Sequence, residues 1–409
     1  MRVLICKKLS IAIISLLFLS VFQVFSQAGC TDSLANNYDP GAVENDGSCL
    51  YEEVIISPTN SYPLDDALSG TSGLIYWNDY LWTHNDSSDT NLYQLNPANG
   101  SIVNSISLAP QVNHDWEEIA QDEDYIYVGD FGNNVSGDRT DLKIIRVSKS
   151  SIIEGNPQMD EINFTYQDQT DFTPKDPNNT DYDCEAFVIS ADAIFLFTKE
   201  WLSNETRLYK LPKTPGTYEA ELQDGYDVNG LITGSTYHKD NDVIVLSGYS
   251  NLMQPFVYLL YDFTDEEFFG GNKRKINIEL PFHQVEGIAT NDGLQYWMTN
   301  ESLDFAGINQ QLHTLDLTDF LDNYLHINSV EALPEVKIYP NPTSSILQIV
   351  SEENIFPLKY VILNLKGKII KEGILDNGNS ILDVSKLSAG TYMLNFGQEM
   401  KTEFKFIKK

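Results

Sequence analysis

The chain has 409 residues, of which 42% are hydrophobic and 11% aromatic, so it can bury more than one core and is not a disordered protein. Its formal net charge is −33, and residues 27–331 hold 51 acidic against 13 basic residues, whereas residues 332–409 hold 10 Lys against 8 acidic residues. The field of the acidic part repels nucleic acid and anionic lipid and excludes them as its partners.

The chain begins with a pattern typical of a secretory signal peptide. Arg2, Lys7 and Lys8 precede the apolar run Ile11–Phe25, and the last residues up to Ser26 suit signal cleavage. We therefore assign residues 1–26 to a signal peptide. The apolar run is too short for a good membrane span and no second run follows, so we expect no transmembrane span.

Residues 27–51 form a small module bracketed by Cys30 and Cys49. An exported protein would oxidise this pair to a disulfide, and closing a loop of about 20 residues stabilises a small unit by about 3 kcal/mol in the chain-entropy model. The stretch resembles the Cys-bracketed NYDP…DGSC modules in secreted proteins of Bacteroidetes-type bacteria. Cys184 lies between Asp183 and Glu185, which disfavour its thiolate, so we expect a free and unreactive thiol.

Residues 52–330 repeat one pattern five times. Each copy has a small residue or Glu, a short apolar strand, an Asp/Asn/Gly turn and an aromatic-rich second strand, which is the pattern of a β-hairpin. The copies begin at Ser72, Glu117, Glu185, Gly234 and Glu286, at intervals of 45, 68, 49 and 52 residues. This period predicts an all-β fold, a β-propeller of five blades.

A sixth blade stays open as an alternative. It would lie hidden in the 68-residue interval, or form where residues 53–57 pair with residues 313–317. We see no long helical period in the repeat region.

Acidic residues recur where each hairpin begins and ends. The two strands are antiparallel, so the start of the first and the end of the second lie at one edge. We therefore expect carboxylates from several blades to meet at one mouth of the disc and to hold calcium, which prefers oxygen ligands. The expected set is Asp86, Asp115, Glu117, Asp130, Asp183, Glu185, Glu200, Glu286 and Glu301. Alternatively, each acid only accepts hydrogen bonds at a strand end.

The segments HDWEEIA, VGDFGNN and VEGIA distantly resemble those of phytase-like and esterase-like propellers of exported bacterial proteins. The resemblance implies calcium and phosphate at a mouth of the disc. Only Arg139 and Lys199 could supply the basic groups that phosphate needs. As catalytic candidates near the mouth we single out His114, Arg139 and His283.

Residues 331–409 form a different domain, with six alternating runs typical of a small β-sandwich. The segments KIYPNPTSS, NLKGKII, LDVSKLSAGTYML and KFIKK resemble, in this order, the type A C-terminal sorting domain of the type IX secretion system. The resemblance implies contact with that secretion machinery and export through the periplasm to the outer cell surface or beyond.

The sequence is compatible with two classes of function. The first is a secreted or cell-surface propeller that binds an extracellular ligand or partner at an acidic, calcium-organised mouth. The second is a calcium-dependent phosphoesterase or esterase-like hydrolase that uses the same mouth, so the sequence leaves open whether the protein is an enzyme. Only an enzyme needs a positioned base and an anion-stabilising group.

Overall fold

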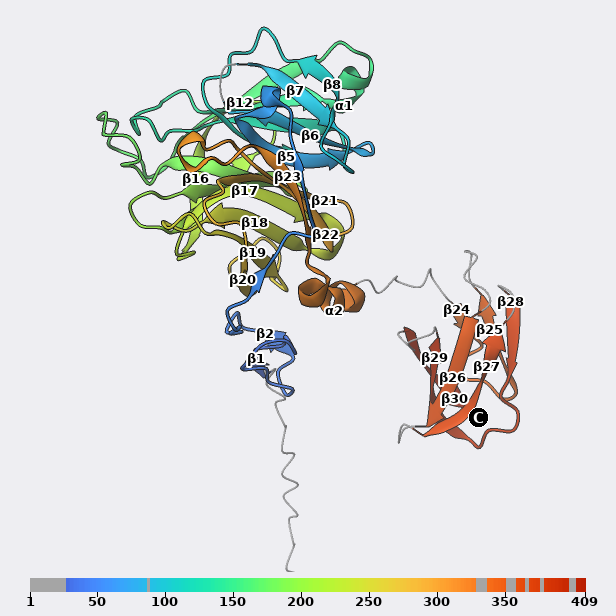
Figure 1. Ribbon diagram of the computed structural model, residues 1–409. Helices are drawn as coiled ribbons and strands as arrows, with labels where there is room; N and C mark the ends of the chain where they lie inside the picture. The colour runs from blue at the N-terminus through green and yellow to red at the C-terminus, as the bar shows by residue number, and fades with distance from the viewer. Residues whose placement is uncertain are drawn as a thin grey trace, which may run out of the picture.

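The computed structural model describes residues 27–86, 89–328, 337–350, 358–364, 368–375, 379–396 and 402–409 (Figure 1). The predicted signal peptide, residues 1–26, lies outside the described residues. Among the residues that are described, no helix is long and apolar enough to cross a membrane.

The described part of residues 52–328 forms the five blades of a propeller, each built on four strands (Figure 1). The second and third blades join into one eight-stranded sheet, and the fourth blade carries a fifth strand. The first blade is β5 (Thr71–Trp77), β6 (Tyr80–Asn85), β7 (Asn91–Leu95) and β8 (Ile102–Ser107). The second is β9 (Trp116–Gln121), β10 (Tyr125–Asp130), β11 (Lys143–Ser148) and β12 (Met159–Tyr166). The third is β13 (Asp183–Ile189), β14 (Ala193–Lys199), β15 (Thr206–Pro212) and β16 (Gly216–Tyr226).

The fourth blade is β17 (Leu231–His238), β18 (Val243–Tyr249), β19 (Pro255–Tyr261) and β20 (Asn272–Ile278). The fifth is β21 (Val285–Thr290), β22 (Gln295–Asn300), β23 (Gln311–Asp316) and, from the other end of the propeller sequence, β4 (Asn60–Pro63). Short helices interrupt the connections: η1 (Asp66–Leu68), α1 (Lys149–Ile153), η2 (Lys239–Asn241) and η3 (Asp304–Ala306).

The disc closes as a five-bladed ring. The innermost strands are neighbours in the order β5, β9, β13, β17, β21 and back to β5. The closure differs in detail from the pairing considered for a sixth blade, because Asn60–Pro63 pairs with β23, while β3 (Ile55–Ile56) extends the fourth blade beside β20. The 68-residue interval supplies β11 and β12 of the second blade, and β12 pairs in parallel with β16 of the third.

The hydrophobic core lies between the blades. Each pair of neighbouring blades shares one cluster of buried side chains, which include Trp82 with Ile126, Tyr127 with Phe187, Phe197 with Phe256, Val257 with Met298, and Leu81 with Leu312. Glycines let the innermost strands approach closely at the axis. A Cβ on Gly234 would lie 1.8 Å from the carbonyl oxygen of Glu286 on the next strand.

Outside the blades the structure contains the N-terminal module and one helix. The module has the two-residue strands β1 (Ala28–Gly29) and β2 (Glu44–Asn45), and Cys30 and Cys49 form the predicted disulfide. Cys184 is free and buried. The helix α2 (Thr318–Asn328) follows the fifth blade and is 11 residues long, in a region where the sequence shows no long helical period.

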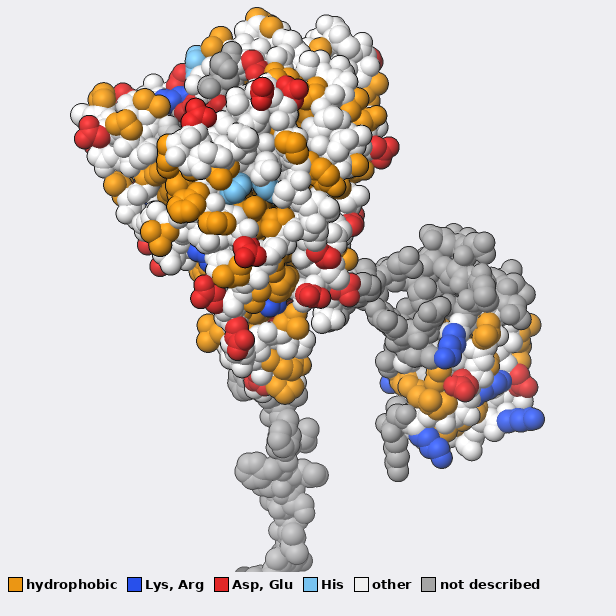
Figure 2. Space-filling view, in the orientation of Figure 1, with side chains coloured by type: hydrophobic (Ala, Val, Ile, Leu, Met, Phe, Trp, Pro, Cys, Tyr) orange, Lys and Arg blue, Asp and Glu red, His pale blue; other side chains and the backbone are white. Residues whose placement is uncertain are grey.

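Residues from 337 onward form two sheets. One contains β24 (Lys337–Tyr339), β25 (Ile346–Val350) and β28 (Asn379–Asp383), and the other contains β27 (Ile369–Leu375), β26 (Leu358–Asn364), β29 (Gly390–Phe396) and β30 (Thr402–Lys408). A shared cluster that includes Leu347, Ile362 and Leu394 fills the space between them. Figure 2 shows Asp and Glu scattered over the propeller, whereas Lys and Arg are frequent on the described surface of this domain.

Candidate functional site

The strand-entry glutamates lie in β-bulges. The register of the innermost strand shifts near its start in every blade, and the skipped position is Glu117 in β9, Glu185 in β13 and Glu286 in β21. Thr233 in β17 and Gly73 in β5 lie within the corresponding shifts. A bulge adds a residue that leaves the regular alternation and re-aims its side chain. The repeated Glu in the sequence therefore reflects a repeated backbone feature.

The strand exits lie at the same edge as these bulges. Asp130 pairs with Trp116, Lys199 with Asp183, and Asn300 with Val285, so each second strand ends beside the start of the first. The expected juxtaposition of strand entries and exits is thus present in the register.

At this edge the carboxylates form what we call the acidic mouth. Its inner layer is buried and consists of Glu117, Asp183, Glu185, Lys199 and Glu286. Its outer layer is partly buried and consists of Asp86, Asp115 and Glu301. The two layers interact electrostatically. Besides burial, the charge of Asp115 raises the pKa of Glu117, and the charges of Glu301 and Asp86 raise the pKa of Glu286.

Lys199 is the buried cation of the acidic mouth. Its Nζ donates to Glu185 Oε2 at 2.5 Å and lies 4.7 Å from the ring centre of Trp201 and 5.2 Å from that of Tyr249. Burial acts to lower the pKa of Lys199, but the neighbouring acidic groups, led by Glu185 and including Glu286 and Asp183, together outweigh burial and leave this pKa well above its ordinary value. The mouth therefore holds its own ammonium ion near a carboxylate and two aromatic rings. The sequence identified Lys199 as a basic residue near the mouth but did not predict these partners.

The carboxyl groups hold protons at unusually high pH. Burial, reinforced by neighbouring carboxylates, raises the pKa of Glu185 to about 8, that of Asp115 to about 7 and that of Glu301 to about 7. Burial likewise raises the pKa values of Glu117 and Glu286 well above the ordinary range. One lysine does not neutralise this group, so the mouth retains excess negative charge or bound protons.

Two buried acids of this region, Glu118 and Glu286, differ in how far their oxygen atoms are hydrogen-bonded. Glu118, on the neighbouring position of β9, accepts hydrogen bonds from Ser235 N at 2.6 Å and Ile119 N at 2.9 Å, and so links β9 to β17 across the axis. Glu286 Oε2 is buried and has no hydrogen-bond partner among the residues that the structure describes. Glu118 is therefore a structural acid, whereas Glu286 presents an unused acceptor.

Two expected metal ligands are engaged elsewhere. Asp130 binds Arg139 Nη2 through Oδ1 at 2.9 Å, and it also accepts from Asp115 N at 3.3 Å at the border of the mouth. Glu200 accepts from Ser203 Oγ at 2.5 Å and lies 3.3 Å from Arg207 Nε. In the part of the chain that the structure describes, no group of three or more His, Cys, Asp or Glu side chains is placed to hold a metal ion.

The catalytic candidates lie apart from the inner layer. Arg139 binds Asp130, Asp141 and the carbonyl oxygen of Gly132, at 2.9, 3.0 and 2.8 Å. His114 Nδ1 lies 3.3 Å from Asp141 Oδ2. The ring of His283 packs at 5.7 Å against that of His313. Arg139 is thus bound to structural partners, and among the described residues these contacts join neither histidine to a side chain of the inner layer.

The fold defines residues 52–328 as a β-propeller with an acidic mouth. The comparisons identify the C-terminal domain. Residues 337–409 match the family model of the secretion system C-terminal sorting domain. This domain indicates export by type IX secretion and a cell-surface or extracellular location. No curated protein matches the chain by sequence.

Among solved structures, PorZ, a surface component of the type IX secretion system of Porphyromonas gingivalis, is 11% identical with a TM-score of 0.31, over 83% of this chain and 45% of that chain. This chain thus spans less than half of that protein. RRP9 WD40 repeats are 8% identical with a TM-score of 0.34, over 64% of this chain and 99% of that chain. A chain of the mitotic checkpoint complex is 10% identical with a TM-score of 0.30, over 59% of this chain and 60% of that chain. Likenesses of this size say nothing about function.

Proposed function

We propose that the propeller is an exported binding module whose acidic mouth takes a cationic ligand. The observation that carries the proposal is the buried Oε2 atom of Glu286, which has no hydrogen-bond partner in the described part of the chain. The carboxylates of Glu185, Glu301 and Asp86 act on Glu286, and Lys199 offsets them only in part. An unpaired acceptor among like charges is costly for the fold, and a bound cation would satisfy both its hydrogen bonding and its charge.

The partly buried outer layer gives the ligand its approach. Asp86, Asp115 and Glu301 are accessible to solvent, whereas the acids beneath them are nearly inaccessible. A ligand would therefore first meet the outer carboxylates and then the acceptor of Glu286. Net negative charge over residues 27–331 would also attract a cation from a distance.

Calcium is the cation that the carboxylate chemistry suggests first. Calcium takes six to eight oxygen ligands at 2.3–2.6 Å and carries twice the charge of an ammonium ion. The described acids are not spaced for a metal as they stand. Calcium binding would therefore require the carboxylates of the outer layer to close inward, whereas an organic ammonium or guanidinium ion could bridge the present arrangement. The engaged state of Arg139 does not favour the hydrolase alternative.

Calorimetric titration with calcium chloride, spermidine and arginine methyl ester tests the proposal. We expect at least one of these cations to bind the wild type, and Glu286→Gln to weaken that binding by about tenfold, the equivalent of about 1.4 kcal/mol for a charge-assisted contact. Glu123→Gln is the matched control, since Glu123 is exposed in the turn at the far end of the β9–β10 hairpin. Absence of binding by all three cations, or equal weakening by both variants, would overturn the proposal.

A further inference from the structure

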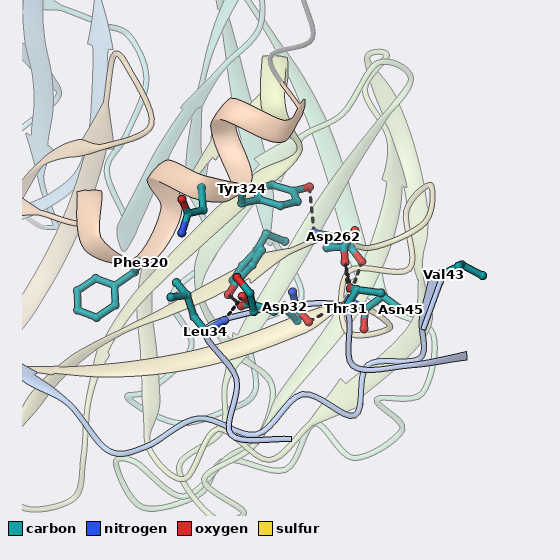
Figure 3. A pocket seen from close by; sticks show the side chains of 12 residues that line it. Thr31, Asp32, Leu34, Val43, Asn45, Asp262, Phe320 and Tyr324 are labelled. Carbon is teal, nitrogen blue, oxygen red and sulfur yellow. Dashed lines mark hydrogen bonds between the residues drawn. The ribbon is translucent and has the colours of Figure 1, made fainter. Parts of the chain in front are cut away.

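A cavity of about 230 Å³ lies where three parts of the chain meet (Figure 3). Asp32 and Asn45 of the Cys-bracketed module line one side, Tyr261 and Asp262 of the fourth blade line another, and Asn323 in α2 completes it. None of these parts belongs to the acidic mouth. The cavity is therefore a separate candidate site, built from three segments that are far apart in the sequence.

Asp262 fixes the three parts relative to one another. Its Oδ2 accepts hydrogen bonds from Thr31 Oγ1 at 2.7 Å and from Asn45 Nδ2 at 2.9 Å, and its backbone N–H donates to the Tyr324 hydroxyl at 3.0 Å. The residue has a φ of 55°, in the left-handed region that Asp and Asn tolerate better than most residues. The backbone conformation thus turns one side chain toward the module and one N–H toward α2.

A second set of contacts fixes the floor of the cavity. Asp32 Oδ2 accepts hydrogen bonds from the hydroxyl groups of Tyr51 at 2.8 Å and Tyr261 at 2.6 Å. Behind it the guanidinium of Arg274 lies between two rings, 4.8 Å from that of Tyr51 and 4.7 Å from that of Phe320. Because these walls are tied together, the cavity is preformed, and a ligand would not have to order it.

The lining excludes an anionic ligand. Among the described residues that line the cavity there is no Lys and no Arg, and two of them are aspartates. Much of the acceptor capacity of both aspartates is used by hydroxyl and amide groups of the protein. Fewer of their oxygen lone pairs therefore remain to coordinate a cation, and a neutral donor-rich ligand fits the remaining acceptors better.

Two polar side chains of the lining are unused. Neither the amide of Asn323 nor the hydroxyl of Ser33 makes a side-chain hydrogen bond within the described part of the chain, and both line the cavity. The half-buried rings of Phe320 and Tyr324 add apolar surface to the same walls, whereas the ring of Tyr261 is itself buried. Amide and hydroxyl groups that have no partner in the protein can hydrogen-bond the hydroxyl groups of a ligand, and the nearby aromatic rings can pack against its C–H groups.

We propose that this cavity binds a neutral, hydroxylated ligand of monosaccharide size, such as a terminal hexose or N-acetylhexosamine unit of a glycan. Asn323 and Ser33 hydrogen-bond its hydroxyl groups, and the aromatic walls contact its C–H face. The size follows from the volume, because drug-sized ligands occupy pockets of roughly 300–1,000 Å³ and this cavity is smaller. The proposal is independent of the acidic mouth and stands if that site binds nothing.

Saturation-transfer NMR on the chain from residue 27 to residue 409 tests the proposal, with methyl glycosides of glucose, galactose, mannose and N-acetylglucosamine as probes. We expect transfer to the ring protons of at least one glycoside. Asn323→Ala should weaken its binding about fivefold, as expected for one neutral hydrogen bond. The matched control is Asn104→Ala, because Asn104 is an exposed residue of β8 and does not line the cavity.

A second variant removes the wall instead of one contact. Replacing Cys30 and Cys49 by Ser releases the segment that carries Thr31 and Asp32, so transfer should be lost while the melting of the propeller persists. The proposal is wrong if no glycoside receives saturation, or if Asn323→Ala and Ser33→Ala melt and bind like the wild type. It is also wrong if tetramethylammonium chloride binds at the cavity and the glycosides do not.

Discussion

Raising the pH from about 5 to about 8 should destabilise the propeller, the reverse of ordinary acid denaturation. The acidic mouth causes this behaviour, because burial and crowding raise the pKa of Glu185 to about 8, and those of Asp115 and Glu301 to about 7. In the unfolded chain the same groups lose their protons near pH 4. Between these values the folded state binds more protons than the unfolded state.

The sign and the size follow from this difference. The free energy of unfolding falls with pH wherever the folded state holds the extra protons, so stability falls from about pH 4 to about pH 8. For Glu301 alone, a pKa that moves from 4.5 to about 7 corresponds to about 3 kcal/mol, at about 1.4 kcal/mol for each pKa unit. The three groups share protons, so their effects do not add, and we expect a total loss of a few kcal/mol. Lys199 stays charged throughout this range, so its own contribution does not change.

The assay is urea unfolding at about pH 5, 6.5 and 8 in the presence of a chelator, with stability extrapolated to water. Glu286→Gln should stabilise the protein at about pH 8 and flatten the profile, because it removes a charge that repels Glu185. Glu123→Gln, at the opposite end of a hairpin, should leave the profile unchanged. A wild-type stability that rises or stays level between pH 5 and 8 would refute the reasoning.

Four further predictions concern single parts of the molecule. Lys199→Met should destabilise the propeller by about 3–5 kcal/mol in urea unfolding near pH 8, since it strands Glu185. Gly234→Ala should lower stability by at least about 3 kcal/mol in the same assay, because its Cβ would meet the carbonyl oxygen of Glu286. Cys184 should react with thiol reagents only after denaturation. Deleting residues 335–409 should retain the protein in the periplasm, as cell fractionation would show, without changing propeller melting.

The five blades could be predicted from the sequence because their information is local. The turns within the hairpins use residues that adopt positive φ, such as Asn78 at 52° and Asp79 at 66°, or Gly293 at 75°. Alternating strands on either side of such turns specify a hairpin before any tertiary contact forms. The sorting domain was recognisable for another reason, since its segments KIYPNPTSS and KFIKK occur in the expected order.

The contents of the acidic mouth were harder to predict, because they depend on contacts between blades. The repeated Glu was visible, but the sequence pattern did not show the β-bulge that re-aims each side chain, which lies in the register between the two strands of each hairpin. The sequence identified Lys199 as one of two basic residues near the mouth, but it did not show that Lys199 is buried and paired with Glu185. The sequence pattern also gave Glu200 the same role as Glu185. Glu200 follows Lys199 directly, and because successive side chains of an extended segment point to opposite faces, Glu200 contacts Ser203 and Arg207 instead.

The topology places the two proposed sites at opposite faces of the disc. The mouth is built where second strands end, whereas β19 and β23 run away from that edge, so Asp262 and the start of α2 lie at the other face. The chain therefore leaves the propeller on the side of the cavity, and every residue of the mouth precedes α2. Removal or retention of residues 337–409 should then leave cation binding unchanged. A truncated propeller that lost cation binding but kept its melting temperature would show that the mouth is not a self-contained site.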